Sequence, residues 1–225
     1  MPITMRLKKQ SEPRWRMTYA SLEEALKRYR VGNLSLYDLT FRSPVMVVFL
    51  RHGGCTFCRE ALGDLASVRE RIAGTGTELV VVQMGSARQG EELARRFGLR
   101  DTQVISDPSR RLYKAFALGR GTFRQIFGLR IWPRLFQTAL MRRYGAGLPR
   151  GDMRQMPGVF LLGDGRIIEE FRHQTIADRP DYVALASLAG GDVERRNEPL
   201  EDPTIRELEV QGMTKTSSIE PRTRR

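Results

Sequence analysis

The sequence predicts an α/β fold in which a central mixed β-sheet is flanked by helices. Short apolar runs rich in β-formers alternate with amphipathic helical segments, and a hairpin signature follows them. The chain has 225 residues, which is long enough to bury a substantial core. The expected elements, in chain order, are a helix over 21–30, a strand over 45–50, a helix over 55–74, a strand over 78–83, a helix over 86–97, a strand over 104–105, a helix from Asp107–Pro108, hairpin strands over 158–162 and 166–171, and a helix over 178–189.

Capping and turn residues set the ends of these elements. Ser21 with Glu24, and Ser86 with Gln89, have the spacing of a capping box, which predicts a helix start at each serine. Glycines at the ends of the helical stripes predict where helices stop, and the last helix is expected to close at Gly190-Gly191. The run 45–50 is apolar throughout, which is typical of a central strand covered on both faces.

Charge and composition suggest three regions. We expect a basic extension with a short helix over 1–31, a globular domain over 32–190 with an insert at 118–154, and a charged, disordered tail over 191–225. The net charge of +12 is concentrated in residues 1–20 and in the insert, which carries eight arginines and one aspartate.

The N-terminus and the cysteine content predict a cytoplasmic location. The first residues contain no apolar stretch long enough for a signal peptide. The longest apolar run, 45–50, is far too short to cross a bilayer, so no transmembrane segment is expected. Two cysteines do not make a secreted disulfide scaffold, so a reducing compartment is the default.

The two cysteines, Cys55 and Cys58, lie where the apolar run ends and a long helix is predicted to begin. Residues three apart on a helix have Cβ atoms about 5–6 Å apart, so small adjustments allow a reversible disulfide. Unpaired N–H groups and the macrodipole at a helix start favour a thiolate. We expect a redox pair in which Cys55, beside two glycines, is the more exposed thiol.

Two other interpretations of the pair stay open. A zinc site would need His52 and His173 to join the cysteines, and nothing in the spacing brings His173 there. The thiols could also be an inert buried pair. Arg51 and Arg59 flank the motif and would stabilise a thiolate, while His52 is a candidate proton donor and equally a structural histidine.

Four segments resemble the peroxiredoxin-like branch of the alkyl hydroperoxide reductase/thiol-specific antioxidant superfamily, which has a thioredoxin-like fold. They are Val-Phe-Leu-Arg-His-Gly-Gly-Cys55-Thr-Phe-Cys58-Arg-Glu, Gln155-Met-Pro157-Gly-Val-Phe-Leu-Leu, Asp164-Gly-Arg-Ile and Ala177-Asp-Arg-Pro-Asp-Tyr. The resemblance covers about residues 32–190. It implies a thioredoxin-like redox domain, and a cis Met156-Pro157 bond that packs against the cysteine pair.

The chain departs from the pattern of typical peroxiredoxins, Pro-x-x-x-Thr-x-x-Cys. Aligned on Cys58, it has Arg51 at the proline position and Cys55 at the threonine position. This departure puts peroxidase activity in doubt, while thiol–disulfide exchange fits both cysteines. The thioredoxin analogy makes Cys55 the attacking residue, the peroxiredoxin analogy makes it Cys58, and we favour Cys55.

The sequence therefore predicts a thiol–disulfide oxidoreductase, or peroxiredoxin-like antioxidant protein, that needs no metal or organic cofactor. Its expected partners are a disulfide or peroxide substrate and a dithiol reductant such as a thioredoxin or glutathione system. The alternatives are a zinc-stabilised module and a non-catalytic binding or redox-sensor protein that docks on an anionic partner through residues 118–154. A further interpretation of the insert is a helical elaboration with a solvated basic face.

Overall fold

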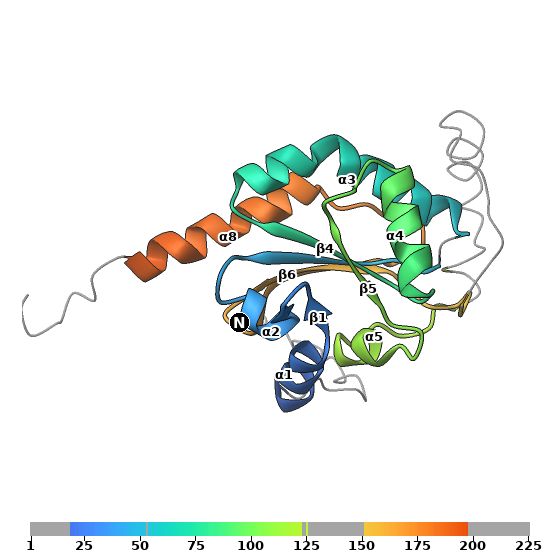
Figure 1. Ribbon diagram of the computed structural model, residues 1–225, viewed down its shortest axis with the longest axis horizontal. Coiled ribbons are helices and arrows are strands. Elements are labelled where there is room, and N and C mark those ends of the chain that lie inside the picture. The colour runs from blue at the N-terminus through green and yellow to red at the C-terminus, as the bar shows by residue number, and fades with distance from the viewer. Residues whose placement is uncertain (1–18, 53, 123–124, 126–150, 198–225) are drawn as a thin grey trace, which may run out of the picture. The chain divides into compact units, whose positions relative to one another are not determined.

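A five-stranded mixed sheet forms the centre of the molecule in the computed structural model, which describes residues 19–52, 54–122, 125 and 151–197 (Figure 1). The strands are β3 (Val45–Phe49), β4 (Glu78–Gln83), β5 (Gln103–Ser106), β6 (Gly158–Gly163) and β7 (Arg166–Arg172), and the order across the sheet is β5-β4-β3-β6-β7. Strands β3, β4 and β5 are parallel, and β6 is antiparallel to both β3 and β7. The predicted mixed sheet is confirmed.

Helices cover both faces of the sheet, so the predicted three-layer arrangement is also confirmed (Figure 1). One face carries α3 (Thr56–Gly74), α4 (Ala87–Arg96) and residues 182–189 of α8 (Tyr182–Asn197), and the other carries α1 (Tyr19–Arg28), α2 (Leu36–Leu39) and α5 (Arg111–Ala115). Every residue of β3 is buried, because side chains on alternate positions enter opposite cores. Met46 and Val48 join the core under α3, whereas Val47 and Phe49 join the core under α5.

The N-terminal helix differs from its expected bounds. Helix α1 spans Tyr19–Arg28, so Ser21 lies inside it and not at its start. It ends at Arg28, and the chain then forms a small antiparallel hairpin of β1 (Arg30–Val31) and β2 (Leu34–Ser35). Gly32 lies in the turn of that hairpin with φ of +59°, a conformation that glycine adopts without strain.

The second expected capping box is present, and the next helix start is shifted. The Ser86 side chain accepts from the Gln89 N–H, and the Gln89 side chain accepts from the Ser86 N–H, at the start of α4. Helix α5 begins at Arg111 and not at Asp107–Pro108. The Asp107 carboxylate accepts the N–H groups of Arg111 and Leu112, which satisfies the free donors of that helix start.

The hairpin predicted near residue 160 is confirmed as β6 and β7. Its turn is formed by Asp164 and Gly165, both with positive φ. Thr40 joins this turn to the N-terminal part of the chain, since its carbonyl accepts the Asp164 N–H and its hydroxyl accepts the Gly165 N–H.

Helix α8 continues past the two glycines that were expected to end it. It runs through Gly190 and Gly191 to Asn197. Glycine costs a helix only about 1 kcal/mol per residue, so two of them do not stop a helix whose flanking residues favour it. The chain divides into two compact units, residues 1–189 and 190–225.

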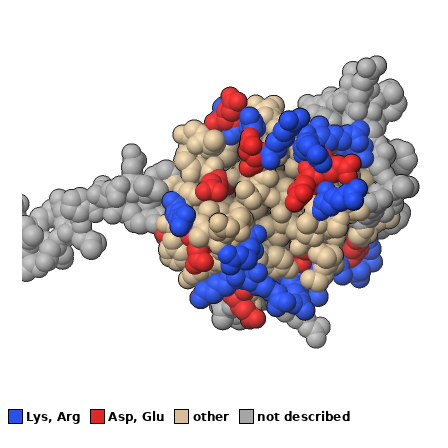
Figure 2. All heavy atoms as spheres, in the orientation of Figure 1, with Lys and Arg blue, Asp and Glu red and all other residues tan. Residues whose placement is uncertain are grey.

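The basic regions of the sequence fall mostly outside the described residues. Of residues 1–20 the structure describes only Tyr19 and Ala20, and of the insert it leaves out 123–124 and 126–150. On the face drawn in Figure 2, the basic side chains of the described residues lie among acidic ones. Within the described part of the chain, no helix combines the length and apolar character needed to cross a membrane.

Candidate active site

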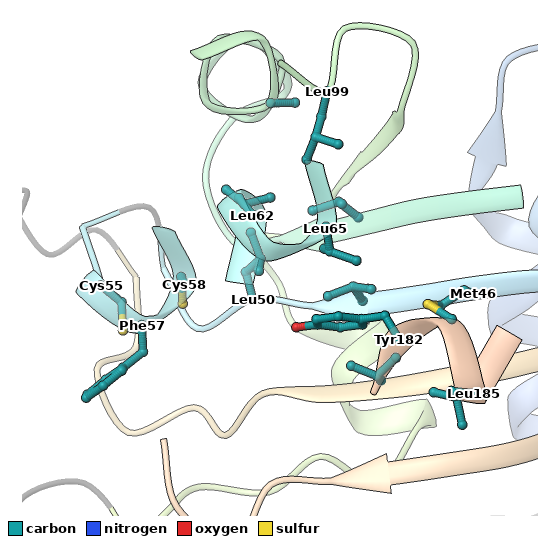
Figure 3. Packing of buried hydrophobic residues seen from close by; sticks show 14 of the residues in the cluster. Met46, Leu50, Cys55, Phe57, Cys58, Leu62, Leu65, Leu99, Tyr182 and Leu185 are labelled. Atoms are coloured by element: carbon teal, nitrogen blue, oxygen red, sulfur yellow. The ribbon is translucent and has the colours of Figure 1, made fainter. Parts of the chain in front are cut away.

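The two cysteines lie at the carboxyl end of the central strand, as the sequence predicts. Strand β3 ends at Phe49, a short loop follows, and Cys55 is the N-cap of α3 in an extended conformation. The Cys55 N–H donates to the His52 carbonyl at 3.0 Å, and the Cys55 carbonyl accepts the Arg59 N–H at 3.1 Å. These backbone bonds fix the loop, so Cys58 lies one turn into the helix beside Cys55 (Figure 3).

Both thiols are free, lie 3.6 Å apart and are buried. Cys55 is 6% exposed and Cys58 4% exposed, so Cys55 is only slightly more exposed than Cys58 and neither thiol is open to solvent. The Arg51 side chain contributes to this burial, because it joins the Cys55 sulfur to the backbone of residue 153 in the insert. The Arg51 Nη1 atom lies 3.5 Å from the Cys55 sulfur, and its Nη2 atom donates to the Met153 carbonyl.

The surroundings of the two sulfurs separate their pKa values. The hydrogen bond from Cys58 lowers the pKa of Cys55 to about 6, with further lowering by the Arg51 guanidinium and by the N–H groups of Cys58 and Phe57, against an opposing effect of burial. Burial, and then the neighbouring Cys55 sulfur, raises the pKa of Cys58 well above its ordinary value. The arrangement favours a Cys55 thiolate beside a protonated Cys58.

The other residues that flank the motif have different surroundings. Arg51 is 4% exposed, and its backbone N–H donates to the Cys58 sulfur at 3.2 Å. His52 is also buried, and burial together with Arg51 lowers its pKa to about 4. A neutral imidazole at physiological pH does not supply a proton readily, which speaks against the proton-donor role. Arg59 is half-buried in the first turn of α3.

The Met156–Pro157 bond is trans, so the expected cis bond is wrong. Trans is the ordinary isomer of an X-Pro bond, favoured by about 0.5–1 kcal/mol. In this arrangement the Met156 N–H donates to the Gly119 carbonyl at 3.1 Å. Pro157 lines a small cavity together with Cys58, and Cys55 is not among the lining residues.

That cavity is also lined by residues that no local sequence pattern brings to the site. Its volume is about 10 Å³, near the lower limit for one water molecule. His173, Arg179 and Tyr182 line it, all from the segment after β7. One motif of the family resemblance, 177–182, lies in this segment, but no periodicity or spacing connects it to residue 58.

His173 lines the same cavity as Cys58, although the two residues are 115 positions apart in sequence. It is buried, its Nδ1 atom has no hydrogen-bond partner, and burial followed by Arg179 lowers its pKa to about 4. Across the described residues, three or more His, Cys, Asp or Glu side chains do not gather in a way that could hold a metal ion.

Comparison with known proteins supports one family. The model of the AhpC/TSA antioxidant enzyme family matches residues 64–175. "Peroxiredoxin-like 2C" from Bos taurus is 24% identical over 183 residues, 77% of this chain and 79% of its own length. The human protein of that name is 28% identical over 151 residues, 64% of this chain and 66% of its own length.

The fold agrees with these matches. A solved structure of the Xanthomonas campestris bacterioferritin comigratory protein superposes with a TM-score of 0.50 at 14% identity, and covers 76% of this chain and 94% of its own. These matches support a peroxiredoxin-like family for this chain, and the structure has the thioredoxin fold. The matched family segment begins at residue 64, after both cysteines, so the match does not assign roles to the thiols of this peroxiredoxin-like protein.

Proposed function

We propose that this protein is a thiol–disulfide oxidoreductase and peroxiredoxin-like antioxidant protein in which Cys55 attacks and Cys58 resolves. One observation carries the proposal: the Cys55 sulfur lies at the start of α3, 3.6 Å from Cys58 and 3.5 Å from the Arg51 guanidinium. A cation and helix N–H groups stabilise a thiolate, which is the nucleophilic form of cysteine. The neighbouring thiol is close enough to form a disulfide after a small movement.

With a disulfide substrate, the Cys55 thiolate attacks one sulfur, forms a mixed disulfide and releases the other sulfur as a thiolate. Cys58 then loses its proton and attacks the Cys55 sulfur. This step releases the second half of the substrate and leaves a Cys55–Cys58 disulfide. An external dithiol, of the thioredoxin or glutathione type, reduces that disulfide and is itself oxidised.

With a peroxide, the thiolate attacks the terminal oxygen of the O–O bond. Cys55 becomes a sulfenic acid, and the other oxygen leaves as an alcohol or water after it takes up one proton. Cys58 attacks the sulfenic acid and releases water, which gives the same intramolecular disulfide. The solved structure of the X. campestris relative concerns its alkyl peroxide reduction activity, which supports peroxide as a candidate oxidant here.

Stopped-flow oxidation of single-cysteine variants tests the proposal. Cys55→Ser should lose the reaction with hydrogen peroxide and with a model disulfide. Cys58→Ser should react once and stop at a sulfenic acid or a mixed disulfide, detected by mass. If Cys58→Ser loses the first step and Cys55→Ser keeps it, the assignment of the two sulfurs is reversed. If both variants turn over like the parent, the mechanism is wrong.

The burial of both thiols favours a second candidate, a redox sensor that responds to oxidation without rapid turnover. A sensor would form the Cys55–Cys58 disulfide once per oxidising event, and excess reductant would not sustain consumption of oxidant. Turnover under a reductant such as dithiothreitol therefore separates the two functions. Docking on an anionic partner through residues 118–154 stays a prediction, tested by the salt dependence of binding.

A cytoplasmic location belongs to the same proposal, since a dithiol enzyme needs a compartment that keeps its reductant reduced. Fractionation of cells that produce the tagged full-length chain, followed by trapping of its thiols with an alkylating reagent, would test it. The expected result is the dithiol form in the cytosolic fraction.

A further inference from the structure

The segment that follows β7 reaches the cysteine pair through one side chain, Arg179. Its guanidinium donates to the carbonyl oxygen of Phe57, the residue that precedes Cys58. It also lies 3.2 Å from the Glu60 carboxylate, and the two side chains are 10% and 3% exposed. Its Nη1 atom donates to the Asp178 carbonyl at 2.6 Å, which fixes the guanidinium against its own loop.

The carbonyl that Arg179 contacts is part of the peptide group that also carries the Cys58 N–H. That N–H is one of the backbone donors to the Cys55 sulfur. In a planar peptide group the C=O and N–H are coupled, so a cation on the oxygen fixes the plane and polarises the N–H on its other side. Figure 3 shows Phe57 beside Cys55 and Cys58 at the first turn of α3.

We propose that Arg179 is a positioning residue of the redox site: it holds and polarises the peptide group between Phe57 and Cys58, whose N–H stabilises the Cys55 thiolate. The effect passes from a loop 122 positions away in sequence from Phe57, through one backbone amide, to the attacking sulfur. This inference rests on the proposed function in that it concerns the same thiol, but it can be measured without turnover.

Other charged and titratable groups lie around these residues, and their charges must not change during the measurement. Cys55 is influenced by Cys58 and Arg51, and Arg179 lies near Glu60 and, at 3.7 Å, Asp64. The remaining groups around Arg179 and Cys58 are His52, His173, Asp178, Tyr113 and Tyr182. Two of these, the histidines, have pKa values lowered to about 4 and stay neutral at the pH of the measurement.

The test measures the pKa of Cys55 in a Cys58→Ser parent, from the pH dependence of its alkylation by iodoacetamide. Arg179→Gln should raise the midpoint by roughly one unit, so the rate below the midpoint falls roughly tenfold. Because Arg179→Gln leaves Glu60 as a buried carboxylate without this partner, the variant could fail to fold. A Glu60→Gln/Arg179→Gln variant removes both charges and carries the test in that case.

The paired variant also separates positioning from simple charge balance. If Arg179 acts through the Phe57 carbonyl, the midpoint stays raised when Glu60 is neutralised as well. A midpoint that returns to the parent value shows that Arg179 only compensates Glu60, and the proposal is then wrong. The proposal is also wrong if the Cys55 midpoint is unchanged in both variants.

Arg172→Gln is the matched control. Arg172 also holds backbone carbonyls, those of Phe116 and Ala117 at 2.9 and 3.1 Å, but it packs over the Phe160 ring in the other core. Its loss should leave the Cys55 midpoint unchanged. If Arg179→Gln raises the Cys55 midpoint but the parent protein does not turn over, this inference holds and the proposed function is wrong.

Discussion

Replacement of Arg51 by methionine should raise the pKa of Cys55 by about one to one and a half units. Arg51 Nη1 lies 3.5 Å from the sulfur. At that distance a charge pair is worth about 1 kcal/mol in water and about 5 kcal/mol at an effective dielectric constant of 20. The whole shift of the Cys55 pKa, from 9.0 to about 6, corresponds to about 4 kcal/mol, and the Cys58 hydrogen bond has the largest part in it. The contribution of Arg51 to the shift therefore lies nearer to the lower of these two energies, the value of about 1 kcal/mol for a pair in water.

The assay is the pH dependence of alkylation in the Cys58→Ser parent, which keeps a hydroxyl donor beside Cys55. A midpoint near 7.5 in place of 6 would leave about one quarter of the thiol ionised at pH 7, against about nine tenths in the parent. Arg69→Met, a substitution further along α3, is the control, because Arg69 pairs with Asp101 at the surface. A midpoint that does not move, or falls, would refute the electrostatic role of Arg51.

Two further predictions concern stability. His52 and His173 have folded-state pKa values of about 4 against 6.5, so their stabilising contribution is fully present above pH 6.5 and is lost as the pH falls through 4. It amounts to at most about 3 kcal/mol each, and equal free energies of urea unfolding at pH 7.5 and 4.5 would contradict it. Gly165→Ala should cost roughly 2–4 kcal/mol, since φ is +71° and a Cβ atom would lie 2.5 Å from the Tyr37 ring. Gly32→Ala, with φ of +59° and open space around it, should cost only about 1 kcal/mol, and thermal melts that show equal losses would argue against this reasoning.

The parts of the fold that depend on local patterns could be predicted from the sequence. The strand over 78–83 has the predicted bounds, and the expected start of the long helix at Cys55 is confirmed, since Cys55 is its N-cap. Both are decided by apolar runs and turn residues within a few positions. The capping box at Ser86 is present, and Ser86 is the N-cap of α4. The same spacing at Ser21 does not mark a helix start, because α1 spans Tyr19–Arg28 and includes Ser21.

The parts that depend on distant contacts could not be predicted. Cys55 is buried in a core whose members come from distant segments, and the Arg51 bond to the Met153 carbonyl beside it joins positions 102 residues apart. Likewise, no spacing rule brings His173 or Arg179 beside the cysteine loop, because only the pairing of β6 with β3 and β7 returns the chain there.

Strand β3 sends the side chains of alternate positions into two different cores. Met46, Val48 and Leu50 enter the core that includes both cysteines, while Val45, Val47 and Phe49 enter the core of α1, α2 and α5. Adjacent positions of one strand are therefore open to separate engineering. Cavity-forming changes at Val45 and Val47 should weaken the scaffold and spare the thiols, whereas changes at Met46, Val48 and Leu50 should alter both.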